Sequence, residues 1–130
     1  MTRINLLHPS ELHQKHLSGE IHEITRVFGL VRKAITHKIN KYNFSQKVKQ
    51  PKAYTMGEGH VLFFYNKLGW VADRYEALYD EWEARGYSAA NRIPREELLK
   101  DIDPWWQGGY TPTLEAIEIS RQRIMEMMPE

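Results

Sequence analysis

The sequence predicts an all-α fold: a compact single domain, residues 1–130, of three main helices joined by long loops. One observation is length, because 130 residues can enclose one hydrophobic core but are too few for two ordinary domains. The other is periodicity, because apolar residues recur three and four positions apart near 11–40, 67–85 and 112–127. No repeat or linker suggests a second domain. The helical periodicity leads us to expect helices that pack together without a central sheet.

The first helix is predicted by one apolar stripe between residues 12 and 39. Ser10 is a suitable N-cap for it, and the short arm before Pro9 can fold back onto the helix. Gly19 and Gly29 lie inside the pattern, each costing about 1 kcal/mol relative to alanine. They indicate close approach by another segment or by a ligand, and for Gly29 we favour helix packing. The stripe consists of Leu17, Ile21, Ile24, Phe28, Val31, Ile35 and Ile39.

A second helix near residues 67–85 should end before Gly86, which follows Arg85 in the C′ position. Its opposite face carries carboxylates that would repel DNA, so we expect that face to point away from a duplex. Its apolar stripe consists of Leu68, Val71, Tyr75, Leu78 and Trp82, and the acidic face of Asp73, Glu76, Asp80 and Glu83.

The last third of the chain should hold a short helix opening at Pro94 and a longer one with Thr111 as N-cap and Pro112 at N1. The run at 61–65 fits either a strand or a helical turn. Trp105 and Trp106 can stack on bases, although packing over a core is the commoner use of such residues. Leu114 and Met128 resemble core residues of the last helix. The predicted core is Ile21, Ile24, Phe28, Val31, Phe64, Leu68, Tyr75, Leu78, Ile117 and Ile124.

Composition excludes several classes of protein. The absence of cysteine excludes disulfides, thiolate metal sites and thiol catalysis, and favours an intracellular, cytoplasmic protein. No secretory signal is visible, and the apolar run at 61–65 is far shorter than the roughly 20 residues that span a bilayer. We therefore expect a soluble protein without a membrane partner.

Charge is distributed unevenly along the chain. Residues 1–60 hold ten Lys/Arg against four Asp/Glu, whereas residues 61–130 hold eight against thirteen. The segment 42–54 has several lysines and no acidic residue, so it is either a mobile loop or a contact for phosphates. A basic first half indicates a polyanionic partner.

Glu23 lies opposite the apolar stripe of the first helix, bordered by basic residues. An ordinary solvated helix face explains this arrangement as well as a binding site does. The bordering residues include Lys15, His16, His22, Arg26 and Lys33.

Longer sequence motifs are more informative than this single helix face. The chain resembles the pyrimidine-dimer DNA glycosylases of the phage endonuclease V type over nearly its whole length, with a small insertion within 36–56. The matching motifs are M-T-R-I-N-L at 1–6, S-E-L at 10–12, H-L at 16–17, E-x-x-E-x-x-R-V-F-G-x-V-R-K at 20–33, G-x-G-H-V-x-F-F-Y at 57–65, K-L at 67–68 and A-I-x-I-S at 116–120.

The resemblance implies a DNA-repair glycosylase and abasic-site lyase that acts on UV-induced cyclobutane pyrimidine dimers in double-stranded DNA. Removal of Met1 would expose the α-amine of Thr2, whose pKa of about 8 leaves a useful neutral fraction near pH 7. That amine would form an imine at C1′ with Glu23 assisting. The resemblance also implies a monomer that needs no metal or cofactor and flips out the base opposite the lesion. The implied DNA-binding residues are Arg3, His22, Arg26, Lys33 and Arg123.

The chain departs from the family pattern at several positions. His22 replaces an arginine, so a constant charge becomes one that titrates near pH 6.5. Lys15 replaces glutamine, Ile21 replaces tyrosine, and Met127 occupies a position that is basic in the family. The sequence ends at Glu130 without the family's aromatic and basic tail, so we expect the lyase chemistry to be kept more strictly than the preference for dimers.

Two alternatives stay open from the sequence. His13, His16 and Glu20 have a helical spacing able to converge on one ion, which would suit a metal-dependent hydrolase. The other alternative is a non-catalytic module of the same fold that binds damaged DNA, suggested by His22 and by the missing tail motif.

Overall fold

The computed structural model describes residues 2–127, so Met1 and the predicted core residue Met128 lie outside the described part. Within it there is no strand, only an isolated antiparallel bridge between Lys67 and Gln107, and the all-α prediction is confirmed. The helices are α1 (Gln14–Ile24), α2 (Arg26–Thr36), α3 (Phe44–Lys47), α4 (Leu68–Ala84), α5 (Arg95–Leu98) and α6 (Leu114–Glu126), with 3-10 turns η1 (Pro9–Glu11), η2 (Leu62–Phe64) and η3 (Pro104–Trp106).

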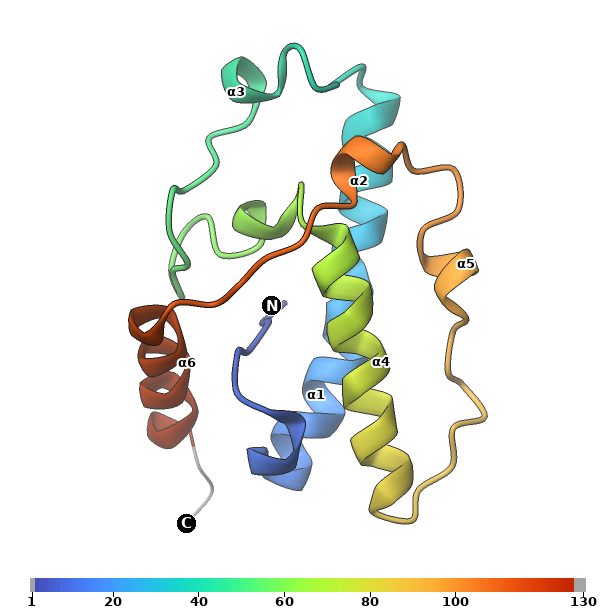
Figure 1. Cartoon of the computed structure of the whole chain (residues 1–130), viewed down its shortest axis with the longest axis vertical. Coiled ribbons are helices and arrows are strands. Elements are labelled where there is room, and N and C mark those ends of the chain that lie inside the picture. The colour runs from blue at the N-terminus through green and yellow to red at the C-terminus, as the bar shows by residue number, and fades with distance from the viewer. Residues whose placement is uncertain (1, 128–130) are drawn as a thin grey trace.

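The predicted first helix is two helices that follow one another along the same line (Figure 1). They meet at Thr25, whose φ of −66° and ψ of −19° remain in the right-handed helical region. The apolar stripe therefore continues across the junction and is buried from Leu17 to Val31. The prediction of one continuous helix was wrong, but the buried face was predicted correctly.

Helix starts differ from the predicted ones by a few residues. His13, not Ser10, caps α1 by accepting a 3.1 Å hydrogen bond from the nitrogen of Lys15, because η1 intervenes. Thr113, not Thr111, caps α6 by accepting from the nitrogen of Ala116. Pro94 precedes α5 in an extended conformation.

The core lies between α1, α2 and α4, and the N-terminal arm runs between α6 and the α1–α4 pair (Figure 1). The ten predicted core residues are buried except Ile117, which is partly buried. Leu114 is 85% exposed, so its placement in the core was wrong. The run at 61–65 forms the η2 turn, and Trp105 and Trp106 pack edge-on against Phe44, which is the core use of these residues.

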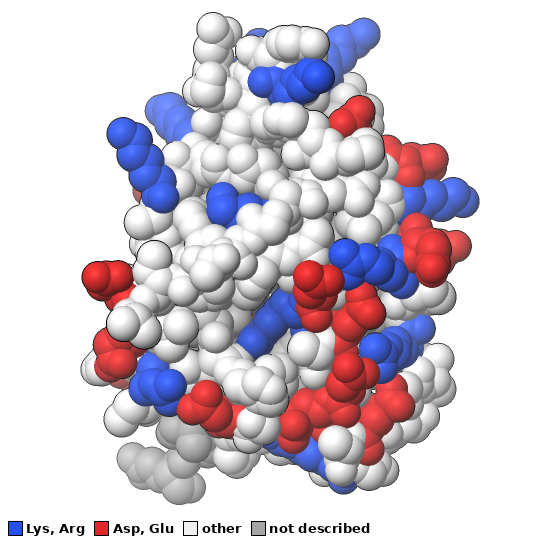
Figure 2. All heavy atoms as spheres, viewed as in Figure 1, with Lys and Arg blue, Asp and Glu red and all other residues white. Residues whose placement is uncertain are grey.

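The acidic face of α4 is covered by arginines from the segment that follows the helix. Arg92 pairs with Asp80 and Glu83, and Arg95 pairs with Asp73 and Glu76. Figure 2 shows acidic and basic side chains interspersed over the side of the molecule where α4 and α5 lie. Two arginines against four carboxylates leave this face net negative, as the sequence predicted.

Among residues 2–127, no helix is both long and apolar enough to cross a membrane.

Candidate active site

The N-terminal arm, residues 2–8, has no regular secondary structure, yet it is buried from Ile4 to Leu7. Buried main-chain groups need partners, and here side chains from distant segments supply them. The nitrogen of Arg3 donates to Glu23 (3.1 Å), that of Ile4 to His60 Nε2 (2.8 Å) and that of Leu6 to Ser120 Oγ (2.9 Å), while the carbonyl of Ile4 accepts from Tyr54 (2.7 Å) and that of Leu7 from Arg74.

Glu20 and Arg74 form a buried ion pair beneath the arm. Arg74 Nε lies 2.8 Å from Glu20 Oε2, and the two side chains are 6% and 1% exposed. Asn5 donates a further 2.8 Å hydrogen bond to Glu20 Oε1, which joins the arm to α1 and α4. Because these bonds occupy the Glu20 carboxylate, Glu20 holds the structure together at this point.

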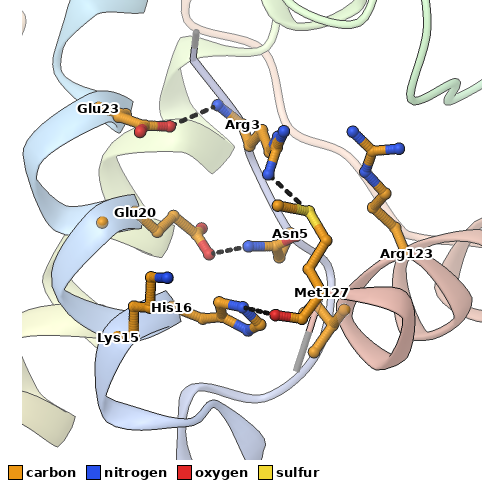
Figure 3. Close-up of a pocket in the computed structure, with 10 residues that line it drawn as sticks. Arg3, Asn5, Lys15, His16, Glu20, Glu23, Arg123 and Met127 are labelled. Atoms are coloured by element: carbon orange, nitrogen blue, oxygen red, sulfur yellow. Dashed lines mark hydrogen bonds between the residues drawn. The ribbon is translucent and has the colours of Figure 1, made fainter. Parts of the chain in front are cut away.

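A cavity of about 180 Å³ lies beside this network, between the arm, α1 and the end of α6 (Figure 3). Gly19 opens onto it, and nothing lies within 4 Å of where its Cβ would be. The same is true of Gly29, so no segment packs closely there and that expectation was wrong. The cavity is lined by Arg3, Asn5, Lys15, His16, Gly19, Glu20, Glu23, Arg123, Ile124 and Met127.

The carboxylate of Glu23 lies close to the start of the chain. Its Oε1 accepts the 3.1 Å hydrogen bond from Arg3, and the Thr2 nitrogen is only three covalent bonds from that donor. Because three such bonds span about 3.7 Å at most, the Thr2 nitrogen lies within about 7 Å of the Glu23 oxygen. The geometry thus brings together the two residues that the sequence singled out for chemistry.

Cationic side chains dominate the rest of the cavity wall. Arg3, Lys15 and Arg123 line it, whereas Glu20 is neutralised by Arg74. Within the described chain, Arg123 Nε and His16 Nδ1 are buried without a hydrogen-bond partner. His16 Nε2 faces the carbonyl of Met127, and the Arg3 guanidinium contacts the sulfur of the same residue (Figure 3). The cavity therefore offers an anion positive charge and, at Arg123 Nε, an unused donor.

The remaining predicted DNA-binding residues lie outside this cavity. Arg26 is exposed at the start of α2, one turn after Glu23. His22 stands on a neighbouring face of α1, where its Nδ1 donates a 2.7 Å hydrogen bond to the carbonyl of Ser18. There it borders a second cavity, of about 350 Å³, with Tyr79 and Trp82.

Lys33 borders a wide groove of about 960 Å³ between α2 and the basic segment after it. His37 and the lysines at 47 and 49 line the same groove, and Glu58 is the acidic residue among them. A row at helical spacing leads there from the candidate active site along the exposed side of α1 and α2: Glu23, Arg26, Leu30, Lys33 and His37.

The hypothesis of a metal site on His13, His16 and Glu20 was wrong. Between residues 2 and 127, no three His, Asp or Glu side chains are arranged to hold a metal ion. His13 Nδ1 caps α1, and Glu20 is committed to Arg74. Helical spacing placed the three residues near one another but could not show that two of them have other partners.

Sequence reasoning missed the residues that hold the arm: Tyr54, His60, Arg74 and Ser120. A signal existed for Arg74, which falls within the apolar stripe of α4, three residues after Val71 and four before Leu78. A lone arginine on a buried face requires an anionic partner. His60 and Ser120 lie within the motifs quoted at 57–65 and 116–120, although neither was assigned a role, and for Tyr54 we find no comparable signal.

Comparison with known families adds one finding. A family model described as pyrimidine dimer DNA glycosylase matches residues 1–94. The matched part contains Thr2, Arg3, Glu23 and His60, and it ends before α6, which supplies Arg123.

Proposed function

Since the chain belongs to the pyrimidine dimer DNA glycosylase family, we propose that it acts on UV-induced cyclobutane pyrimidine dimers in double-stranded DNA by a linked glycosylase and abasic-site lyase reaction. The supporting observation is the hydrogen bond from Arg3 to Glu23, which sets a carboxylate beside the first residues of the chain in a cationic cavity. The proposed substrate is duplex DNA with dimers or abasic sites, bound by a monomer in the cytoplasm.

The proposed nucleophile is the α-amine of Thr2 after removal of Met1. Its nitrogen forms a bond to C1′ of the damaged nucleotide while the glycosidic C1′–N bond breaks and the electron pair leaves with the base. Opening of the sugar gives an imine, loss of a proton from C2′ follows, and the C3′–O bond breaks to release the 3′ phosphate. The amine is regenerated when water hydrolyses the imine.

Glu23 is proposed to act on charge and protons during these steps. Its carboxylate faces the same cavity as the start of the arm, so it can stabilise the positive charge that builds up on the sugar. It can also accept and return protons during imine formation and elimination. A carboxylate on a helix suits this role because its position is fixed before the substrate arrives.

The proposed DNA path starts at the cavity and follows the exposed row on α1 and α2. Arg3 and Arg123 would hold phosphates near the lesion, and Arg26 and Lys33 those that lie further along the strand. The lysines at 47 and 49 line the same groove as Lys33 and extend the basic surface. His22 lies beside the second cavity, which offers room for a base displaced from the duplex.

Three duplexes test the proposal: one irradiated with ultraviolet light, one with a single abasic site and one undamaged. We expect cleavage of the first two only, undiminished by excess chelator. Retention of the damaged duplexes without any cleavage would instead identify a non-catalytic binding module. Loss of activity with chelator would show that a metal takes part.

A further inference from the structure

Both polar main-chain groups of Ile4 are bound by side chains of a single loop, residues 54–60. The Ile4 nitrogen donates to His60 Nε2 at 2.8 Å, and the Ile4 carbonyl accepts from the Tyr54 hydroxyl at 2.7 Å. All three residues are buried, with exposures of 0%, 6% and 4% for Ile4, His60 and Tyr54. The loop therefore binds the arm at Ile4, two residues after Thr2.

The loop presents His60 in one defined orientation and tautomer. Gly59 has a φ of +88°, and a Cβ there would lie 2.8 Å from the Pro51 side chain, so only glycine fits the turn. His60 Nδ1 is 2.6 Å from the carbonyl of Thr55, which can only accept, so Nδ1 carries the proton. Nε2 is then a bare acceptor for the Ile4 N–H.

We propose that His60 and Tyr54 are positioning residues for the reaction, holding Ile4 so that the α-amine of Thr2 stands beside Glu23. This inference rests on the proposed function. Only a few rotatable main-chain bonds separate Ile4 from the Thr2 nitrogen. Among the main-chain hydrogen bonds described for the arm, those of Ile4 are the closest in sequence to this amine after the Arg3 bond to Glu23. Effective attack on C1′ requires placement within a fraction of an ångström, so a rigid Ile4 accelerates chemistry rather than binding.

The surroundings of His60 keep its ring in the neutral form, in which Nε2 can accept the hydrogen bond from Ile4. Its ring packs edge-on against Tyr54 and Phe64, and the charged groups that act on its pKa are Glu20, which raises it, and Arg3 and Arg123, which lower it. Burial lowers the pKa of His60, so the ring is neutral near pH 7. Burial also raises the pKa of Tyr54 above its ordinary value, so its hydroxyl remains a donor. Protonation of His60 at Nε2 would remove the acceptor and release the Ile4 nitrogen.

Four variants test the proposal. His60→Met has no acceptor at this point, His60→Gln supplies an amide oxygen at a similar reach, and Tyr54→Phe removes the donor to Ile4. Tyr42→Phe is the matched control, because Tyr42 is 82% exposed and far from the arm in sequence. Two quantities are measured for each folded variant: the single-turnover rate of borohydride trapping on an abasic-site duplex, and the affinity for a duplex with a non-cleavable abasic analogue.

We expect His60→Met and Tyr54→Phe to trap roughly ten- to a hundred-fold more slowly, with a far smaller change in affinity. His60→Gln should recover most of the rate, and the advantage of wild type over His60→Gln should shrink as the pH falls and His60 becomes protonated. If His60→Met does not fold, the trapping rate of Tyr54→Phe alone tests the inference. An unchanged trapping rate in Tyr54→Phe, together with an unchanged rate in any folded His60→Met, would overturn the inference and leave the proposed function standing. Absence of trapping by the wild-type protein would instead overturn the proposed function.

Discussion

The main-chain nitrogen of Arg3 donates a hydrogen bond to the carboxylate of Glu23, and this bond ties the arm to α1 at the residue next to Thr2. The hydrogen bond requires an oxygen acceptor at position 23 but not a negative charge. Two properties of Glu23, its role as acceptor for Arg3 and its charge, can therefore be tested separately. An amide oxygen could accept the same bond. Substitutions at Glu23 can therefore test the charge while they keep the placement.

Glu23→Gln should keep the fold and the affinity for damaged duplex but lose most base release, with a rate about a hundred- to a thousand-fold lower. The reason is that glutamine keeps the acceptor for Arg3 but cannot stabilise a cationic sugar. Release of the damaged base from a dimer-containing duplex under single turnover is the measurement. Glu97→Gln, an exposed carboxylate on α5, is the matched control. Unchanged base release by Glu23→Gln would remove this residue from the mechanism.

The buried pair of Glu20 and Arg74 should matter for stability. Arg74→Leu leaves the Glu20 carboxylate buried without its cation and frees the carbonyl of Leu7, so we expect the free energy of unfolding to fall by about 3–5 kcal/mol. The double variant with Glu20→Leu removes the stranded charge and should regain a large part of that loss. Urea unfolding monitored by circular dichroism measures both values. Equal stability of the single and double variants would show that the stranded charge is not the cause.

Stability should also fall in mild acid because of His60. Burial lowers its pKa in the folded chain below the unfolded value of about 6.5. Between these two pKa values the unfolded chain binds more protons, so lowering the pH through that window favours unfolding. The contribution is complete above about pH 6.5 and is lost towards the folded pKa. Urea unfolding at several pH values should show this loss in wild type and a weaker one in His60→Gln.

The helices were predictable because their signal is local. The stripe from Leu17 to Val31 repeats every turn, and burial of one face follows directly from that repeat. The ends were less predictable, since the choice between Ser10 and His13 as N-cap depends on η1, whose three residues carry no periodicity. Thr25 was missed for a similar reason, because a residue that keeps helical angles leaves the apolar stripe intact.

The arrangement of the arm was not predictable from pattern. His60 and Tyr54 lie 56 and 50 residues after Ile4 in the sequence, and Ser120 lies 114 after Leu6. Such contacts depend on how the helices pack, which no spacing rule encodes. Helix periodicity placed Glu23 opposite the apolar stripe, but only the resemblance to a family singled it out for chemistry. His22 shows the limit of that reasoning, since one step along α1 turned it towards a different cavity.

The groove on α2 should contribute to affinity through charge alone. Replacing Lys33, Lys47 or Lys49 by alanine should weaken binding about equally for damaged and undamaged duplex, because phosphate contacts carry no information about the lesion. Each lost contact should reduce the slope of log affinity against log salt concentration by about 0.9. Fluorescence anisotropy at several salt concentrations measures the slope, with Lys100→Ala as a control outside the groove. An unchanged slope in all three variants would exclude the groove from the DNA path.

The last prediction concerns the nucleophile, for which there are two candidate amines: the α-amine of Thr2, the residue before Arg3, and the ε-amine of Lys15 in the cavity wall. At pH 7 the α-amine, with a pKa of about 8, is roughly 200-fold more often neutral than a lysine amine with a pKa of about 10.4. We therefore expect borohydride to trap abasic-site DNA on the N-terminal peptide once Met1 is removed. Mass spectrometry after protease digestion identifies the modified residue.

Variants separate the two amines further. The hydroxyl of Thr2 has no part in imine formation, so Thr2→Ser and Thr2→Ala should keep activity. Thr2→Pro replaces the primary amine by a hindered secondary one. Acetylation of the Thr2 amine, or retention of Met1, converts the Thr2 nitrogen into an amide nitrogen, which is not nucleophilic. Each of these changes should therefore impair trapping. Lys15→Met should still trap, because Lys15 would contribute charge to the cavity rather than the reacting nitrogen. An adduct on Lys15, or full reactivity in protein that retains Met1, would show that the α-amine is not the nucleophile.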